Sequence, residues 1–198
     1  MKKFFCMALF VLAFATTGCN TQPKPQAASN PEQIAYKIGD TGPARGIIFY
    51  DKGNNQDGWR YLEAAPASTE FTAEWGLDDV SIKTEMKIGT GKRNTELIVA
   101  ALARRGETGR AAQIVDAMRV NGFGDWFLPS WEELGLMYNN LHTRGLGGFN
   151  KDAYYWASSS FEYGDDNHLG AYNMPFMEDG GMGFARAQNN WVRAVRAF

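Results

Sequence analysis

The chain has 198 residues, with 20 Lys and Arg residues against 22 Asp and Glu residues and a formal net charge of −2. This near-neutral balance argues against a strongly basic surface, so we expect no nucleic-acid partner. Beyond a short N-terminal leader, the length suits one domain with a sizeable core.

Residues 1–18 are typical of a secretory signal peptide. Two lysines precede an apolar run from Phe4 to Ala15, which is shorter than the ~20 residues of a membrane-spanning helix. The letters TTGC, ending at Cys19, are similar to the lipobox of bacterial lipoproteins, although Thr16 stands where leucine is usual. We therefore expect a lipid on Cys19. The alternative is an ordinary signal peptide that ends near a cysteine.

Residues 19–34 are predicted to be the lipidated cysteine and a flexible linker. The segment from Asn20 to Gln33 contains three prolines and neither aromatic nor large aliphatic residues, so it cannot bury enough apolar surface to fold. Cys6 leaves with the signal peptide, and residues 35–198 contain no cysteine. We therefore expect neither a disulfide nor a cysteine nucleophile in the domain. The expected location is the bacterial cell envelope, lipid-anchored at the outer membrane and facing the periplasm or the cell surface.

A β hairpin is predicted at the start of the domain. The letters RGIIFYD (residues 45–51) are β-branched and aromatic, and GWRYLEAAP (residues 58–66) predicts the second strand. The stretch from Ser68 to Arg93 has no sustained period and is predicted to be mostly loop.

Three amphipathic helices are predicted next, within residues 94–106, 109–122 and 130–141. The first has Asn94 or Thr95 as its cap and stops at Gly106. The third begins with the capping box formed by Ser130 and Glu133.

The remaining chain is predicted to return to β structure. AYYWASSSF (residues 153–161) is strand-like, the glycine- and asparagine-rich stretch after it predicts short strands among long loops, and WVRAVRAF (residues 191–198) predicts one closing strand. The order of hairpin, helices and late strands predicts an α+β fold.

Several motifs together resemble the Lcl C-terminal domain family, long catalogued as a domain of unknown function. GDWFLPSWEEL (residues 124–134), YYWASSSFE (154–162) and VRAVRAF (192–198) follow its order and spacing, and EAAPASTEFTAEWG (63–76) and IGTGKRNTELIVAAL (88–102) also look like its members. The resemblance covers residues 35–198. It implies a C-type-lectin-like fold in which the first and last strands pair. A more distant similarity is to the formylglycine-generating sulfatase-modifying domains, which share the W-x-LP-[ST]-x-x-E corner.

The corner at residues 124–134 is predicted to be mainly structural, with a functional loop as the alternative. Aromatic residues at this density usually contribute packing energy. In the closing strand, at least one of two arginines is expected to point inward and to need a carboxylate or carbonyl partner. The expected structural residues are Trp126, Leu128, Pro129, Ser130, Trp156, Arg193 and Arg196.

The sequence offers little for catalysis. Neither His142 nor His168 belongs to a known catalytic motif, and Glu132 and Glu133 are adjacent on a helix, where they do not face each other. The relatives that make formylglycine use cysteines, which this domain lacks. We expect no enzymatic activity, and a modifying enzyme is kept only as an alternative.

Calcium is the one cofactor that the sequence suggests. Glu162, Asp165 and Asp166, with Asn167 beside them, are hard oxygen ligands within one loop. The alternative is a solvated acidic turn, and we otherwise expect no cofactor.

Two basic segments, residues 87–93 and 104–110, are candidates for binding sulfated polysaccharide, as some relatives are thought to do. The alternative is ordinary charge at helix ends, which the acidic total favours.

The resembled fold places its recognition loops between the late strands, here residues 161–190. Aromatic residues there can supply contact area and polar residues hydrogen bonds, although the apolar residues alternatively cover a core. The candidate ligand-binding residues are Tyr163, Asp165, Asp166, Asn167, Tyr172, Asn173, Phe176, Gln188 and Asn189. The function expected is a membrane-anchored, non-catalytic binding or adhesion module for a protein or glycan. The alternative is a structural envelope lipoprotein.

Overall fold

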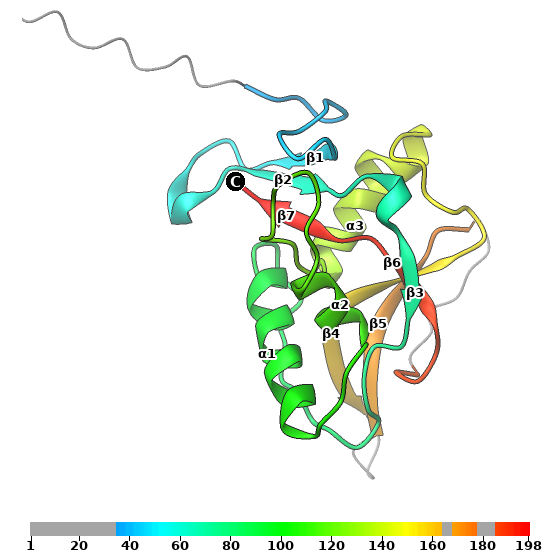
Figure 1. The fold of residues 1–198 in the computed structure, drawn as a ribbon. Coiled ribbons are helices and arrows are strands. Elements are labelled where there is room, and N and C mark those ends of the chain that lie inside the picture. Colours follow the sequence, from blue (N-terminus) through cyan, green and yellow to red (C-terminus); the bar gives the residue numbers. More distant parts are fainter. Residues whose placement is uncertain (1–34, 164–167, 178–184) are drawn as a thin grey trace, which may run out of the picture. The chain divides into compact units, whose positions relative to one another are not determined.

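Three helices and two small sheets make up the described part of residues 35–198 in the computed structural model, which describes residues 35–163, 168–177 and 185–198. The mixed α+β class expected from the sequence is therefore confirmed. Residues 1–34, with the predicted signal peptide, lipidation site and linker, lie outside the described residues. Figure 1 shows the three-stranded sheet at the top of the view, and below it strands β4 (Tyr154–Tyr163) and β5 (His168–Pro175) lie side by side.

The first sheet joins the beginning and the end of the domain. Its strands are β1 (Ile47–Asp51), β2 (Tyr61–Ala64) and β7 (Val195–Ala197), in the order β1-β2-β7, and both pairs are antiparallel. The predicted hairpin is confirmed, and β1 and β7 share one sheet. The prediction that these two strands pair directly is wrong, because β2 lies between them. All four residues of β2 are buried, so β2 takes the central position and bonds to both neighbours.

The second sheet contains β3 (Phe71–Ala73), β4 (Tyr154–Tyr163), β5 (His168–Pro175) and β6 (Asn190–Val192), in the order β3-β6-β4-β5. The strand predicted at residues 153–161 is confirmed by β4. Its long antiparallel pairing with β5 was not expected, because the glycines and asparagines after β4 favoured short strands among loops. Short β3 also lies in a stretch predicted to be loop.

The predicted single closing strand is two strands in different sheets. β6 ends at Val192 and β7 begins at Val195, so Arg193 and Ala194 carry the chain from one sheet to the other. The amide of Ala65 donates to the carbonyl of Ala194 at 2.9 Å. A single strand would place Arg193 and Arg196, three residues apart, on opposite faces, whereas both are buried because the strand is interrupted between them.

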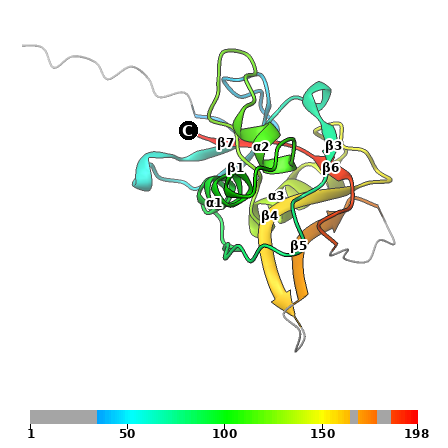
Figure 2. The same ribbon diagram turned by 60° about the horizontal axis from the view of Figure 1, so that its bottom comes forward.

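The helices are α1 (Gly91–Arg104), α2 (Ala111–Asp116) and α3 (Trp131–Asn140), with short 3-10 turns η1 (Gln56–Gly58), η2 (Ala67–Thr69) and η3 (His142–Arg144). Helix α1 packs against α2 and β4, and Figure 2 shows α1 nearly end-on beside the β4–β5 hairpin.

Helix α1 begins earlier than predicted, and the two expected caps do not cap it. Asn94 Nδ2 donates to the carbonyl of Glu85 at 2.7 Å and to Ser158 Oγ at 3.1 Å. Thr95 Oγ1 accepts from the amide of Leu128 at 2.9 Å. Both side chains are buried and connect α1 to distant segments, which local sequence patterns cannot predict.

The capping box of α3 is confirmed. The amide of Glu133 donates to Ser130 Oγ at 3.3 Å, and the amide of Ser130 donates to Glu133 Oε2 at 2.7 Å. Such a cap stabilises a helix by ~1 kcal/mol. Pro129 is buried directly before it, as expected for the turn.

The tryptophans predicted to be structural lie in the core. Trp126 is 3% exposed, and Leu128 and Trp156 are fully buried in the same cluster. Trp156 Nε1 donates to the carbonyl of Ala73 at 2.9 Å, so the large apolar ring is buried without an unpaired donor. The burial of Trp126 and Leu128 favours the structural interpretation of the corner at residues 124–134.

Candidate functional site

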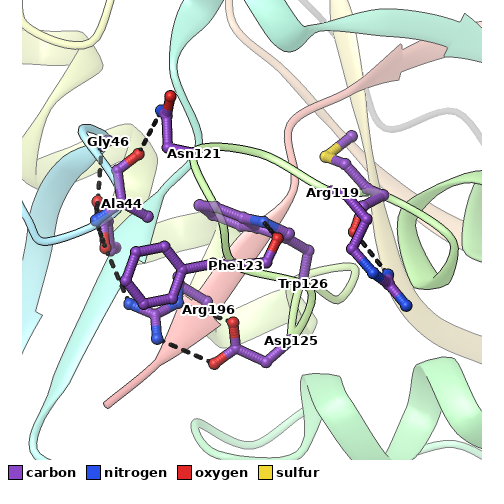
Figure 3. A network of polar contacts seen from close by, with 10 residues as sticks. Ala44, Gly46, Arg119, Asn121, Phe123, Asp125, Trp126 and Arg196 are labelled. Carbon is purple, nitrogen blue, oxygen red and sulfur yellow. Dashed lines mark hydrogen bonds and ion pairs between the residues drawn. The ribbon is translucent and has the colours of Figure 1, made fainter.

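Arg196 is the centre of a polar network that holds three segments together (Figure 3). Its guanidinium donates to both carboxylate oxygens of Asp125, at 2.9 and 3.0 Å, and lies 3.3 Å from Glu63 Oε2. The fully buried Glu63 also accepts the amides of Ala44 and Gly46, at 3.1 and 2.7 Å. The buried charges of Arg196 and Glu63 are therefore paired and hydrogen-bonded, which offsets the cost of removing them from water. The inward orientation expected of the closing arginines is confirmed here.

Arg193 is buried in the same manner. It lies 2.6 Å from Glu70 Oε1 and donates to the carbonyls of Ala65 and Gly147, at 3.0 and 2.9 Å. Both arginines are therefore structural and inaccessible to a ligand.

The adjacent Glu132 and Glu133 hold the segment before α1. Glu132 pairs with Lys87 at 2.7 Å, whereas Glu133 is fully buried and accepts the amide of Gly89 at 2.8 Å. Burial raises the pKa of Glu133 to about 7, against hydrogen bonds from Ser130 and Gly89 that lower it. The two carboxylates anchor a loop and do not form an acid–base pair.

The basic segments are largely neutralised by neighbouring carboxylates. Arg105 pairs with Asp79, and Arg110 with Glu74 and Glu107. In the first segment, Lys87 pairs with Glu132 and Arg93 with Glu96. This arrangement favours ordinary surface charge over a polysaccharide patch.

The candidate ligand-binding residues on the late strands divide between core and surface. Asn173 is 1% exposed and Phe176 is fully buried, so neither side chain lies on the surface. Tyr172 packs on Trp131, with ring centroids 5.1 Å apart. Gln188 and Asn189 are exposed. The side chain of Tyr163, and Asp165, Asp166 and Asn167, lie outside what the structure describes.

The calcium hypothesis stays a prediction. Glu162 is exposed and accepts a hydrogen bond from Ser81 Oγ. Its partners in the proposed loop, Asp165 and Asp166, lie outside the described residues. Within residues 35–163, 168–177 and 185–198, no group of three or more His, Cys, Asp or Glu side chains is placed to hold a metal ion.

A hollow of about 570 Å³ lies beside the C-terminal end of α3. Three separate parts of the chain form it: the end of α3 with η3, the turn before β4, and the residues after β5. We call it the α3-end hollow, and its described lining residues are Tyr138, His142, Thr143, Gly145, Lys151, Asp152, Phe176 and Met177.

Three rings form the aromatic side of the α3-end hollow. Tyr138 and His142 are four residues apart and so lie on one side of the helix end, with centroids 5.1 Å apart and planes at 30°. The ring of Phe176 lies 5.2 Å from Tyr138 and 4.9 Å from His142. Phe176 is fully buried, whereas the other two rings are part-exposed, so the core supports them from beneath.

Local turns place the polar side of the hollow. Gly145, at φ 68°, ends η3 in the left-handed conformation that glycine adopts without strain. The side chain of Asn150 accepts the amide of Asp152 at 3.0 Å, which fixes the turn before β4. Lys151 and Asp152 are exposed, and neither forms an ion pair within the described part of the chain.

The local setting favours the neutral form of His142. Burial, and then the positive charge of Lys151, hold the pKa of His142 below its ordinary value of 6.5. A neutral imidazole offers one hydrogen-bond donor and one acceptor.

The hollow was not predicted from the sequence. Phe176 was named as a contact residue with a position in the core as the alternative, and its complete burial supports that alternative. The one local signal is the spacing of Tyr138 and His142 across the helix end. Lys151 and Asp152 carry no motif, because only the fold brings their turn to α3.

Comparison with known proteins adds no assignment. No family model matches the chain. No curated protein matches it either. The resemblance to the Lcl C-terminal domain family therefore stays a prediction. None of the described helices has the length and apolar character needed to cross a membrane.

Proposed function

We propose that this chain is a non-catalytic binding module of the bacterial cell envelope, and that its partner, a protein or a glycan, binds in the α3-end hollow. One observation carries the proposal: the hollow combines part-exposed rings on a buried support with two charged side chains that have no ion-pair partner in the described structure. Ligand sites commonly combine an apolar wall with a few placed polar groups, in volumes of ~300–1,000 Å³.

The wider setting is also part of the proposal. A lipid on Cys19 and the linker to residue 34 would hold the domain at the membrane, most simply the outer membrane. The α+β class and the shared sheet of β1 and β7 are compatible with a C-type-lectin-like fold in the Lcl C-terminal domain family.

A binding screen with the full chain tests this function. The purified chain is screened in detergent against glycans and envelope proteins, and each hit is retested with a Lys151→Ala, Asp152→Ala double variant. We expect at least a tenfold loss of affinity, because both side chains are exposed and their removal leaves the fold intact.

The matched control is an Arg104→Ala, Asp116→Ala double variant, which also removes one basic and one acidic exposed side chain but lies away from the α3-end hollow. It should bind as the unmodified chain does. If the Lys151→Ala, Asp152→Ala variant binds the partner as tightly as this control does, the partner binds outside the α3-end hollow.

A further inference from the structure

The charges around the α3-end hollow cancel. Among its described lining residues, Lys151 and Asp152 are the charged side chains, and they are adjacent and of opposite sign. His142 adds no charge at neutral pH, since its pKa is held below the ordinary value. Highly charged ligands are selected by fields of one sign. The described lining therefore gives no electrostatic advantage to a polyanion or a polycation.

The shape of the lining favours a ligand with an apolar face and a polar edge. Tyr138 and His142 present part-exposed rings whose positions are fixed by the buried ring of Phe176. Rings held in this way supply contact area at a low cost in conformational entropy. Nothing flexible and apolar dominates the described lining, where Met177 is the one long aliphatic side chain.

The polar groups suit hydroxyls. Asp152 offers only acceptors and Lys151 only donors, while the hydroxyl of Thr143 can do either. A sugar hydroxyl both donates and accepts, so it can satisfy an adjacent carboxylate and ammonium without carrying a charge. A pyranose ring also has a face of C–H groups, which can pack on an aromatic ring.

We propose that the α3-end hollow binds an uncharged saccharide unit, with its C–H face against the rings of Tyr138 and His142 and its hydroxyls hydrogen-bonded to Lys151 and Asp152. This inference rests on the proposed function and narrows its ligand to a neutral glycan.

The test titrates the full chain in detergent with neutral oligosaccharides built from glucose, galactose, mannose or N-acetylglucosamine. At least one should bind. Asp152→Ala should weaken that binding at least tenfold, because the hydroxyls lose their acceptor. Tyr138→Leu should do the same, because the ring is lost, whereas Tyr138→Phe should keep the affinity within about threefold, since a ring-packing contact needs no phenol oxygen.

Two controls make the result interpretable. Thermal unfolding shows whether each variant is folded. If Tyr138→Leu is unfolded, Asp152→Ala still provides the test, because Asp152 is exposed. The Arg104→Ala, Asp116→Ala variant should bind the sugar normally.

The outcomes separate the two proposals. Neutral sugar binding that is unchanged in Asp152→Ala and Tyr138→Leu overturns the saccharide inference. So does a result in which no neutral sugar binds, while heparin or an envelope protein binds and depends on Lys151 and Asp152; the proposed function then stands. If no ligand of any class depends on the hollow, both proposals fail.

Discussion

Two buried glutamates show how single residues hold this domain together. Glu63 and Glu133 are both fully buried, and each accepts backbone amides from a loop that is distant in sequence. They differ in what stabilises the buried carboxylate: Glu63 lies beside the guanidinium of Arg196, whereas Glu133 has hydrogen bonds alone. A buried carboxylate without a cation takes up a proton more readily.

This difference predicts a pH-dependent stability that arises from Glu133. Its folded-state pKa of about 7 lies above the ordinary 4.5, so the folded state binds the proton more tightly. The resulting stability is full below pH 4.5 and is lost as the pH rises through about 7. Glu133→Gln should remove that slope in thermal unfolding followed between these two pH values.

Below pH 4.5, Glu133→Gln should also lower the free energy of unfolding by ~1–3 kcal/mol, because the amide group turns a donor toward backbone donors. This difference should shrink as the pH rises through about 7, where the unmodified chain loses the stability that the protonated Glu133 contributes. A variant that keeps the slope of the unmodified chain would assign the titration to another group.

At the scale of elements, the approach of α1 to α3 requires a glycine. A Cβ added to Gly91 would lie 2.3 Å from Glu133 Oε2 and 2.7 Å from the carbonyl oxygen of Leu128. By contrast, a Cβ on Gly135, inside α3, would meet only the end of Met174 at 3.7 Å, which is ordinary contact.

These glycines should therefore respond in opposite directions to alanine. Gly91→Ala should destabilise the domain by ~1–3 kcal/mol through overpacking. Gly135→Ala should stabilise it by up to ~1 kcal/mol, because alanine is the better helix former. Denaturant unfolding measures both changes, and a loss at Gly135 as large as that at Gly91 would contradict the described packing.

The elements also show what sequence can and cannot predict. The capping box at Ser130 and the first hairpin were predicted correctly, because both depend on neighbours a few residues away. The division of the closing strand at Arg193 was missed, since its reason is the position of two sheets. Likewise, Asn94 is polar and near a helix start, yet its partner Ser158 lies far along the chain.

The candidate site belongs to the scale of the whole molecule. Its rings come from α3, η3 and the end of β5, and its charges from the turn before β4. Phe176 was predicted from the sequence either to contact a ligand or to cover the core, and it is buried beneath Tyr138 and His142. The family resemblance implied a binding module, which stays a prediction, and the surface that we propose depends on the packing of α3 against β5.

Anchoring is the second feature of the whole chain. We predict that Cys19→Ser releases the protein from the membrane fraction, because the lipid would be the attachment and the described helices do not span a membrane. Fractionation and intact mass check this prediction. A variant that stays membrane-bound, beside an unmodified chain whose mass shows no lipid, would overturn the lipoprotein assignment.

The central claim is that the partner occupies the α3-end hollow, and amide chemical-shift perturbation tests it most directly. The labelled full chain in detergent is titrated with the tightest ligand found in the screen. We predict the largest shifts at Tyr138, His142 and the Lys151–Asp152 turn. Shifts centred instead on the separate surface formed by Ile82–Thr84 and Ser160–Glu162, with the α3-end hollow unchanged, would contradict the account.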